Sequence, residues 1–126
     1  MRVDILERFD DGTWGLREVK SSSSASASKG HYDDVAVQLH VVEGSGLSVS
    51  SVELIHVNKE YVREERDIDW TSIFVRADLT DAARKRLSDV QNQLAPMHAI
   101  LNQDAVPEVL VSKSLCTQPY RCDYID

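Results

Sequence analysis

The stretch "RVDILERFDDGTWGLREVK" (residues 2–20) decides how the chain begins to fold. Two runs rich in strand-forming residues, 2–9 and 13–20, flank a short Asp-Asp-Gly sequence. A three-residue loop with glycine last is typical of a β-hairpin, because glycine readily adopts the left-handed conformation that such a loop needs. The sequence therefore predicts two antiparallel strands joined by a turn that ends at Gly12.

The length of the loop sets the register of this hairpin. With three loop residues, Phe9 pairs with Thr13. Counting back along both strands then places Asp4 opposite Glu18. Glu18 and Lys20 share one face of their strand, because side chains alternate between faces. The register predicts that three charged groups converge on one patch of the sheet.

A serine-rich stretch, "SSSSASASKG" (residues 21–30), shows no periodicity and is typical of a flexible loop. The next residues, 31–43, predict a helix that ends before Gly44 and Gly46. The apolar stripe that supports this helix consists of Val35, Leu39 and Val42. A polar stripe beside it consists of His31, Asp34 and Gln38. The β-branched content of the segment leaves a strand open as the alternative.

Strand signals return after this helix. Residues 51–57 alternate well enough for a strand, and residues 60–64 are its expected partner after a turn. Residues 72–79 predict another short strand. Residues 106–111 predict a last short strand or an extended segment.

A long helix is expected from Thr80, which is typical of an N-cap. Its apolar stripe keeps a spacing of four and three residues and comprises Ala83, Leu87, Val90, Leu94, Met97 and Leu101. Pro96 interrupts this helix and is expected to kink or split it. The order of elements predicts one α/β domain over residues 1–126, a mixed sheet with helices packed against it.

The composition limits the classes of function. The chain has 126 residues, of which 42% are hydrophobic and 28% charged, as expected for one globular domain. No apolar run approaches a membrane span and no signal peptide is recognisable, so we expect a cytoplasmic protein without a membrane partner. The net charge of −7 argues against a protein that coats nucleic acid, although an enzyme with a local patch and a metal stays possible. We expect Arg84, Lys85 and Arg86 to form a solvated helix face, and Trp14 and Trp70 to pack in a small core.

The predicted hairpin patch has the chemistry of a site for a hard divalent cation. Such a cation takes oxygen ligands, which the carboxylates of Asp4 and Glu18 and the carbonyl of Val19 could supply. The cation would lower the pKa of a bound water, and Lys20 would reach that water or a phosphate oxygen. The same charges also fit an ordinary solvated strand edge, because Glu-x-Lys occurs often by chance.

Three segments in order, "RVDIL", "REVKSS" and "DDVAVQLHVV", resemble the PD-(D/E)XK nuclease superfamily and its RecB-like branch. A similar likeness runs through "EVKSS", "DDVAVQ" and "NKEYVR" to a bacterial family with a RecB-like domain. The resemblance implies a restriction-endonuclease-like mixed sheet flanked by helices, which cuts DNA phosphodiester bonds with Mg²⁺ or Mn²⁺. It also implies that Asp4 and Glu18 are metal ligands. In the same family context, Lys20 would orient the attacking water or stabilise the phosphate, and Gln38 would support the site or touch DNA.

The C-terminal sequence "CTQPYRC" resembles the cysteine portion of iron–sulfur nucleases in this branch. That resemblance implies Cys116 and Cys122 as cluster ligands, although two free thiols are the alternative. Because the family uses four cysteines, we expect a 4Fe–4S cluster only in a longer protein. The family helix that precedes the Asp is missing here, and the family's Tyr position holds Val42. We therefore expect a fragment truncated at both ends, whose uncovered apolar surface would favour self-association.

These patterns leave three hypotheses open. The first is the core of a metal-dependent nuclease that cuts DNA. The second is a nuclease-like fold that serves as a non-catalytic binding or interaction module. The third is that the hairpin charges form no site and are only a solvated sheet edge.

Overall fold

The computed structural model describes residues 2–26, 30–63 and 67–106, together with residues 108, 112, 114, 116–118 and 121–123. The chain divides into two compact units, Met1–Leu94 and Ala95–Asp126, and each unit is described by itself. In the described part of the chain, neither helix combines the length and the apolar composition that a membrane span needs.

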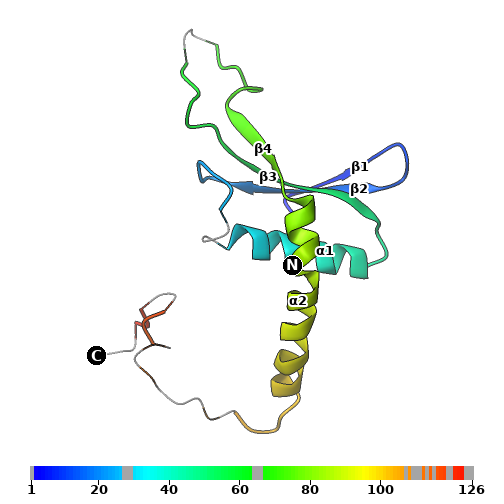
Figure 1. The fold of residues 1–126 in the computed structure, drawn as a ribbon, viewed down its shortest axis with the longest axis vertical. Coiled ribbons are helices and arrows are strands. Elements are labelled where there is room, and N and C mark those ends of the chain that lie inside the picture. Colours follow the sequence, from blue (N-terminus) through cyan, green and yellow to red (C-terminus); the bar gives the residue numbers. More distant parts are fainter. Residues whose placement is uncertain are drawn as a thin grey trace. The chain divides into compact units, whose positions relative to one another are not determined.

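Four strands and two helices follow one another in the order ββαββα (Figure 1). Their bounds are β1 (Ile5–Arg8), β2 (Trp14–Lys20), α1 (His31–Gly44), β3 (Val49–Val57), β4 (Phe74–Asp78) and α2 (Thr80–Leu101). The strands form one sheet in the order β1-β2-β3-β4, in which β2 and β3 are parallel and the outer pairs are antiparallel. The expectation of a mixed-sheet α/β fold is confirmed.

The N-terminal hairpin has the predicted register. The Phe9 N–H donates to the Thr13 carbonyl over 2.9 Å, and Gly12 has the left-handed φ of 84° that the loop requires. Ile5 lies opposite Arg17, which is the pairing that a three-residue loop predicts.

Helix α1 makes the crossover between the parallel strands β2 and β3. It begins at the predicted residue, and its predicted apolar stripe is buried, namely Val35, Leu39 and Val42. Of the serine-rich stretch before it, residues 21–26 are described and residues 27–29 are not. The Val57 N–H at the end of β3 donates to the Ser22 carbonyl over 3.0 Å, which joins the start of this stretch to the sheet.

The partner of β3 differs from the prediction. Residues 60–63 form no strand, and β4 pairs with β3 instead, after a long connection. Asn58 closes the base of this connection, because its N–H donates to the Ile73 carbonyl over 2.9 Å. Trp70 in the connection is 66% exposed, so the prediction that it packs in a core is wrong, while Trp14 is half-buried.

Helix α2 begins at Thr80 and continues through Pro96, so that the proline does not split it. The prediction of Thr80 as N-cap is wrong. Its hydroxyl accepts a hydrogen bond from the Val52 N–H at 2.9 Å and lies 2.6 Å from Asp78, which ties the helix start to β3. The last predicted strand, 106–111, falls largely outside the described residues, and the described ones belong to no strand.

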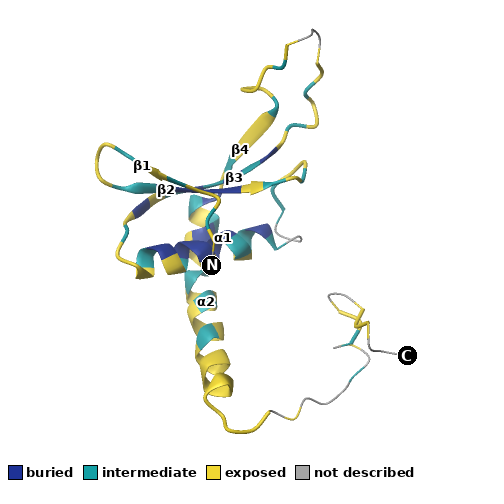
Figure 2. Ribbon diagram, turned by 180° about the vertical axis from the view of Figure 1, so that it is seen from behind, coloured by how far each residue is buried: buried dark blue, intermediate teal, exposed yellow. Residues whose placement is uncertain are grey.

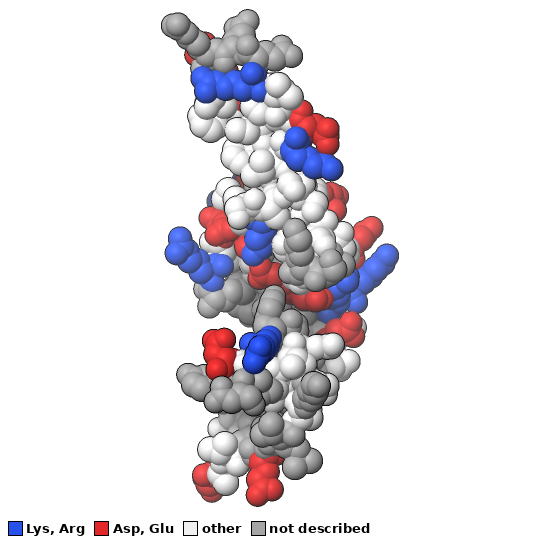
Figure 3. Space-filling view, turned by 90° about the vertical axis from the view of Figure 1, so that its left-hand side faces the viewer, with Lys and Arg blue, Asp and Glu red and all other residues white. Residues whose placement is uncertain are grey.

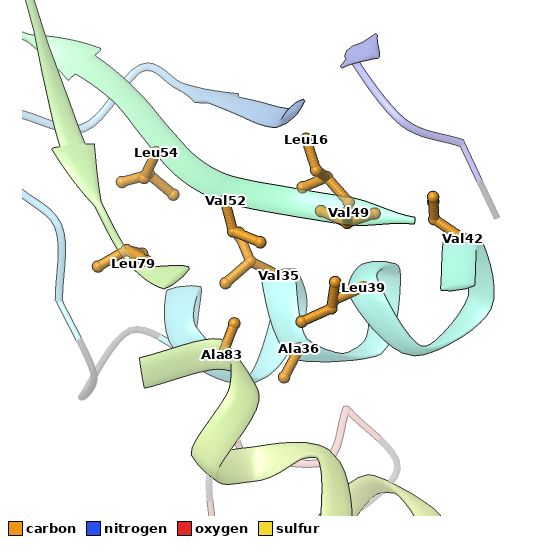
Figure 4. Packing of buried hydrophobic residues seen from close by; sticks show 10 residues of the cluster. All are labelled: Leu16, Val35, Ala36, Leu39, Val42, Val49, Val52, Leu54, Leu79 and Ala83. Carbon is orange, nitrogen blue, oxygen red and sulfur yellow. The ribbon is translucent and has the colours of Figure 1, made fainter. Parts of the chain in front are cut away.

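One face of the sheet carries the hydrophobic core, with α1 and the start of α2 on the same side (Figures 1 and 2). The ten buried members, shown in Figure 4, are Leu16, Val35, Ala36, Leu39, Val42, Val49, Val52, Leu54, Leu79 and Ala83. On the opposite face the register places Ile5, Val19 and Phe74, which are all more than 40% exposed. Helix packing is therefore seen on one face of the sheet among the described residues.

In the basic cluster at the start of α2, Arg84 and Lys85 are exposed, as the sequence predicts, while Arg86 is half-buried. Arg84 lies 3.2 Å from the Glu43 carboxylate, and Arg86 lies 2.8 Å from the Asp33 carboxylate. The Arg86 guanidinium also lies 5.1 Å from the centroid of the Tyr32 ring. These arginines join α2 to α1 and are engaged within the molecule.

Candidate functional site

The C-terminal end of β2 points its polar residues at α1. Leu16, Glu18 and Lys20 alternate onto the face of the sheet that carries the core, since Leu16 belongs to that core. Glu18 is only 6% exposed. A buried carboxylate needs a charged or hydrogen-bonding partner, because its desolvation is costly. The solvated strand edge is therefore the wrong interpretation for Glu18.

Lys20 supplies one of the partners of Glu18. Its Nζ lies 2.6 Å from Glu18 Oε1 and 2.5 Å from Asp34 Oδ2, so that one ammonium bridges two carboxylates. Burial lowers the pKa of Lys20, but the hydrogen bonds to Asp34 and Glu18 and the charges of both carboxylates outweigh it, and the pKa is raised above its usual value. The side chain is thus held in its charged form.

Gln38 supplies the other partner. Its Nε2 donates to Glu18 Oε2 over 2.7 Å and more weakly to Asp34 Oδ1 over 3.3 Å. Gln38 is 4% exposed, and its buried Oε1 has no hydrogen-bond partner. An unpaired buried acceptor is uncommon and marks this amide as a group whose environment is incomplete.

Asp4 lies at the start of β1, where the sheet pairing ends. Its Oδ2 accepts a hydrogen bond from the Val19 N–H over 2.9 Å, in place of a backbone acceptor on β1. The N–H and C=O of one strand residue point to the same side, so the Val19 carbonyl faces the same edge as the Asp4 carboxylate. The structure thus places Asp4 beside Val19 at this edge, and it is exposed.

The structure brings Lys20 and Gln38 into contact with Glu18 and adds Asp34, to which the sequence pattern gave no role. Asp34 was predicted on the polar stripe of α1, one turn before Gln38. That spacing was the available signal, because residues four apart lie on one helix face. The spacing alone does not show that this face of α1 contacts Lys20.

His31, the first residue of the polar stripe, has a different place. It is 7% exposed, and its Nδ1 accepts a hydrogen bond from the Ser26 N–H over 3.2 Å. His31 therefore joins the serine-rich stretch to the start of α1.

The oxygen-rich donor set fits a hard divalent cation. Carboxylates, an amide and a peptide carbonyl are the ligand types that Mg²⁺ and Mn²⁺ take, and the Lys20 ammonium already marks a position at which positive charge lies between two carboxylates. Within the described residues, no group of three or more His, Cys, Asp or Glu side chains is arranged to hold a metal ion. A site here would therefore combine carboxylates with other oxygen ligands.

The predicted cysteine pair belongs to the second unit. Cys116 is half-buried and Cys122 is exposed, and both thiols are free. The Cys122 N–H donates to the Cys116 carbonyl over 2.7 Å, so the backbones of the two residues lie close together in space. Their role as cluster ligands stays a prediction.

A surface depression of about 600 Å³ lies at the start of α2 and not at the polar cluster. Its lining includes Tyr32, Ser50, Ser51, Thr80, Lys85 and Arg86. Glu18, Lys20 and Gln38 are absent from that lining. The case for chemistry at the end of β2 therefore depends on its close polar contacts and not on a deep cavity.

The resemblance to nucleases comes from the order of Asp4, Glu18, Lys20 and Gln38 in the sequence and stays a prediction. These residues come from β2, from α1 and from the chain just before β1. Comparison with protein-family models, with curated proteins and with solved structures finds no match to this chain.

Proposed function

We propose that the chain carries the site of a metal-dependent nuclease that hydrolyses DNA phosphodiester bonds. One observation carries the proposal. Lys20 and Gln38, selected by sequence pattern on two separate elements, each lie within hydrogen-bonding distance of Glu18. Asp4 lies at the neighbouring strand edge, where it holds the N–H of Val19.

The chemistry of each residue supports this function. Mg²⁺ or Mn²⁺ bound at the carboxylates would lower the pKa of an attacking water and would neutralise negative charge on the phosphate. Glu18 and Asp4 would hold that cation, with the Val19 carbonyl as a further oxygen ligand. Lys20, whose pKa is raised, stays protonated at neutral pH and donates hydrogen bonds to the attacking water or a phosphate oxygen. Gln38 fixes the orientation of the Glu18 carboxylate.

The surface charge affects how DNA would be held. On the face shown in Figure 3, acidic and basic side chains are interspersed. Two arginines of the basic cluster are engaged in ion pairs, and the net charge is −7. Because a broad basic surface dominates non-specific DNA binding, we expect weak affinity that depends on the local site and its cation.

Cleavage of DNA tests the proposal. Single- and double-stranded DNA are incubated with the chain and Mn²⁺, and the rate is compared with that of Lys20→Ala. Loss of a positioned charged donor should lower the rate about 100-fold or more. Lys59→Ala is the matched control, since the Lys59 side chain is 70% exposed and pairs with Glu60 and not with the cluster. Equal background cleavage by wild type and Lys20→Ala would end the enzymatic proposal.

The non-catalytic interaction module is the second candidate. The observation that favours it is the apolar side chains exposed on the sheet face opposite the helices, namely Ile5, Val19 and Phe74. Exposed apolar surface of this kind is typical of contact with another protein. The cleavage assay separates the two candidates, because a module without cleavage activity shows no difference between wild type and Lys20→Ala.

A further inference from the structure

The polar cluster is a closed ring of four side chains. The Lys20 ammonium and the Gln38 amide are both donors, and each of them contacts the same two carboxylates, those of Glu18 and Asp34. The sequence pattern assigns Glu18 to a metal but gives no role to Asp34. Yet Asp34 contacts the same two donors as Glu18, with the contact to Gln38 longer, at 3.3 Å against 2.7 Å.

The Lys20 ammonium sits where a metal ion could sit. Glu18 Oε1 and Asp34 Oδ2 lie 2.6 and 2.5 Å from Nζ, so the two oxygens are no further apart than the sum of these distances. Opposite ligands of an octahedral Mg²⁺ are about 4.2 Å apart, given metal–oxygen distances of about 2.1 Å. The separation that one small cation needs lies within this upper limit.

The amide of Gln38 is a second, independent observation that points to a ligand. It is fixed inside the cluster through Nε2, while its buried Oε1 has no hydrogen-bond partner. A half-turn of the amide plane would exchange the two atoms and direct Oε1 toward the carboxylates. That orientation is unfavourable beside two bare carboxylates and favourable when a cation lies between them, because the amide oxygen is then an additional ligand.

We propose that Glu18 and Asp34 form a binding site for a divalent cation, which enters by displacing the Lys20 ammonium from between them. Asp34 is then a metal ligand, and Lys20 is a built-in competitor that leaves the carboxylates when the cation binds. The displaced ammonium becomes available to another anion. This inference takes the class of cation from the proposed function, but it concerns metal binding alone and does not need cleavage to occur.

Metal binding by the full chain tests the inference. Mn²⁺ alone is titrated into each protein, and the free Mn²⁺ is followed by its electron paramagnetic resonance signal. Lys20→Met removes the competing charge and keeps the length of the side chain, so it should bind Mn²⁺ about tenfold or more tightly than wild type. Asp34→Asn should weaken Mn²⁺ binding by about 10- to 100-fold. In the double variant Lys20→Met/Asp34→Asn, the tighter binding caused by Lys20→Met should be lost.

Asp33→Asn is the matched control. Asp33 is the next residue on α1, and it pairs with Arg86 and not with Lys20. It loses the same charge away from the cluster, so its Mn²⁺ affinity should stay within about twofold of wild type, since charges at the surface are screened. Far-UV circular dichroism checks the fold of each variant, and Lys20→Gln and Asp34→Ser serve if either first choice is unfolded.

Several results would overturn the inference. If Lys20→Met binds Mn²⁺ no more tightly than wild type, Lys20 does not compete with the cation. If Asp34→Asn binds Mn²⁺ as tightly as wild type, Asp34 is not a ligand. Absence of saturable binding in every variant removes the site. These outcomes are distinct from failure of the nuclease proposal, which would leave Mn²⁺ binding intact and DNA uncut.

Discussion

Arg17 is the most deeply buried charged side chain among the described residues, at 4% exposed, and it lies on the sheet face opposite the core. Its Nη2 donates to the Glu7 carboxylate over 3.0 Å. Its Nε lies 3.2 Å from Glu53 Oε2 as an ion pair, although the angle is not that of a hydrogen bond. The guanidinium also lies 5.7 Å from the centroid of the Phe9 ring. Two carboxylates are needed here because a buried charge without partners is strongly destabilising.

Gly15 makes room for this guanidinium, and Gly15→Ala should therefore destabilise the protein. A Cβ at Gly15 would lie 2.5 Å from Arg17 Nη2, so the guanidinium would have to leave its partners. We expect the free energy of unfolding to fall by about 1 to 3 kcal/mol, as for other overpacked sites. Urea denaturation measures it. Gly44→Ala at the end of α1 is the control, since no atom lies within 4 Å of that Cβ, and equal midpoints for both variants would contradict the argument.

At the scale of elements, short local hydrogen bonds set where α2 begins. The Asp78 carboxylate accepts hydrogen bonds from the Thr80 N–H at 2.8 Å and the Thr80 hydroxyl at 2.6 Å. These hydrogen bonds, the hydroxyl first, lower the pKa of Asp78 below its usual value. The turn between β4 and α2 is thereby fixed by a residue that the sequence does not mark as a cap.

Asp78→Ala should lower the free energy of unfolding by about 1 kcal/mol at neutral pH, because the side-chain acceptor of the Thr80 N–H at the start of α2 is lost. The folded-state pKa of Asp78 is below the unfolded one, so its stabilisation is complete above the usual carboxyl pKa of 3.8 and disappears as the pH falls through the lowered value. The difference between wild type and variant should therefore shrink in acid. Urea titrations at several pH values measure it, and a difference that is constant down to the acid limit would refute this cause.

At the scale of the whole molecule, stability is concentrated in the first unit. The buried core runs from Leu16 to Ala83, and the partly buried side chains packed against it extend no further than Val90. The described residues of Ala95–Asp126 contribute none of these side chains. The candidate site at the end of β2 belongs to the first unit as well.

A chain shortened to residues 1–102 should therefore keep its fold. Because every described core residue remains, we expect the midpoint of thermal unfolding to change by no more than about 3 °C. Circular dichroism during heating measures it. A midpoint lowered by about 10 °C or more would show that the removed residues contribute to the stability of the core.

The sequence alone determined the N-terminal hairpin, the start and apolar face of α1, and the polar residues Glu18, Lys20 and Gln38 of the candidate site; of the apolar stripe predicted for α2, Met97 and Leu101 are more than half exposed. These features depend on loop length and on the periods of strand and helix, which are local. Only the tertiary structure decided that β4 and not residues 60–63 pairs with β3, that Trp70 lies at the surface, and that Asp34 shares Lys20 with Glu18. Such contacts depend on which distant surfaces bury the most apolar area together, and no local pattern contains that information.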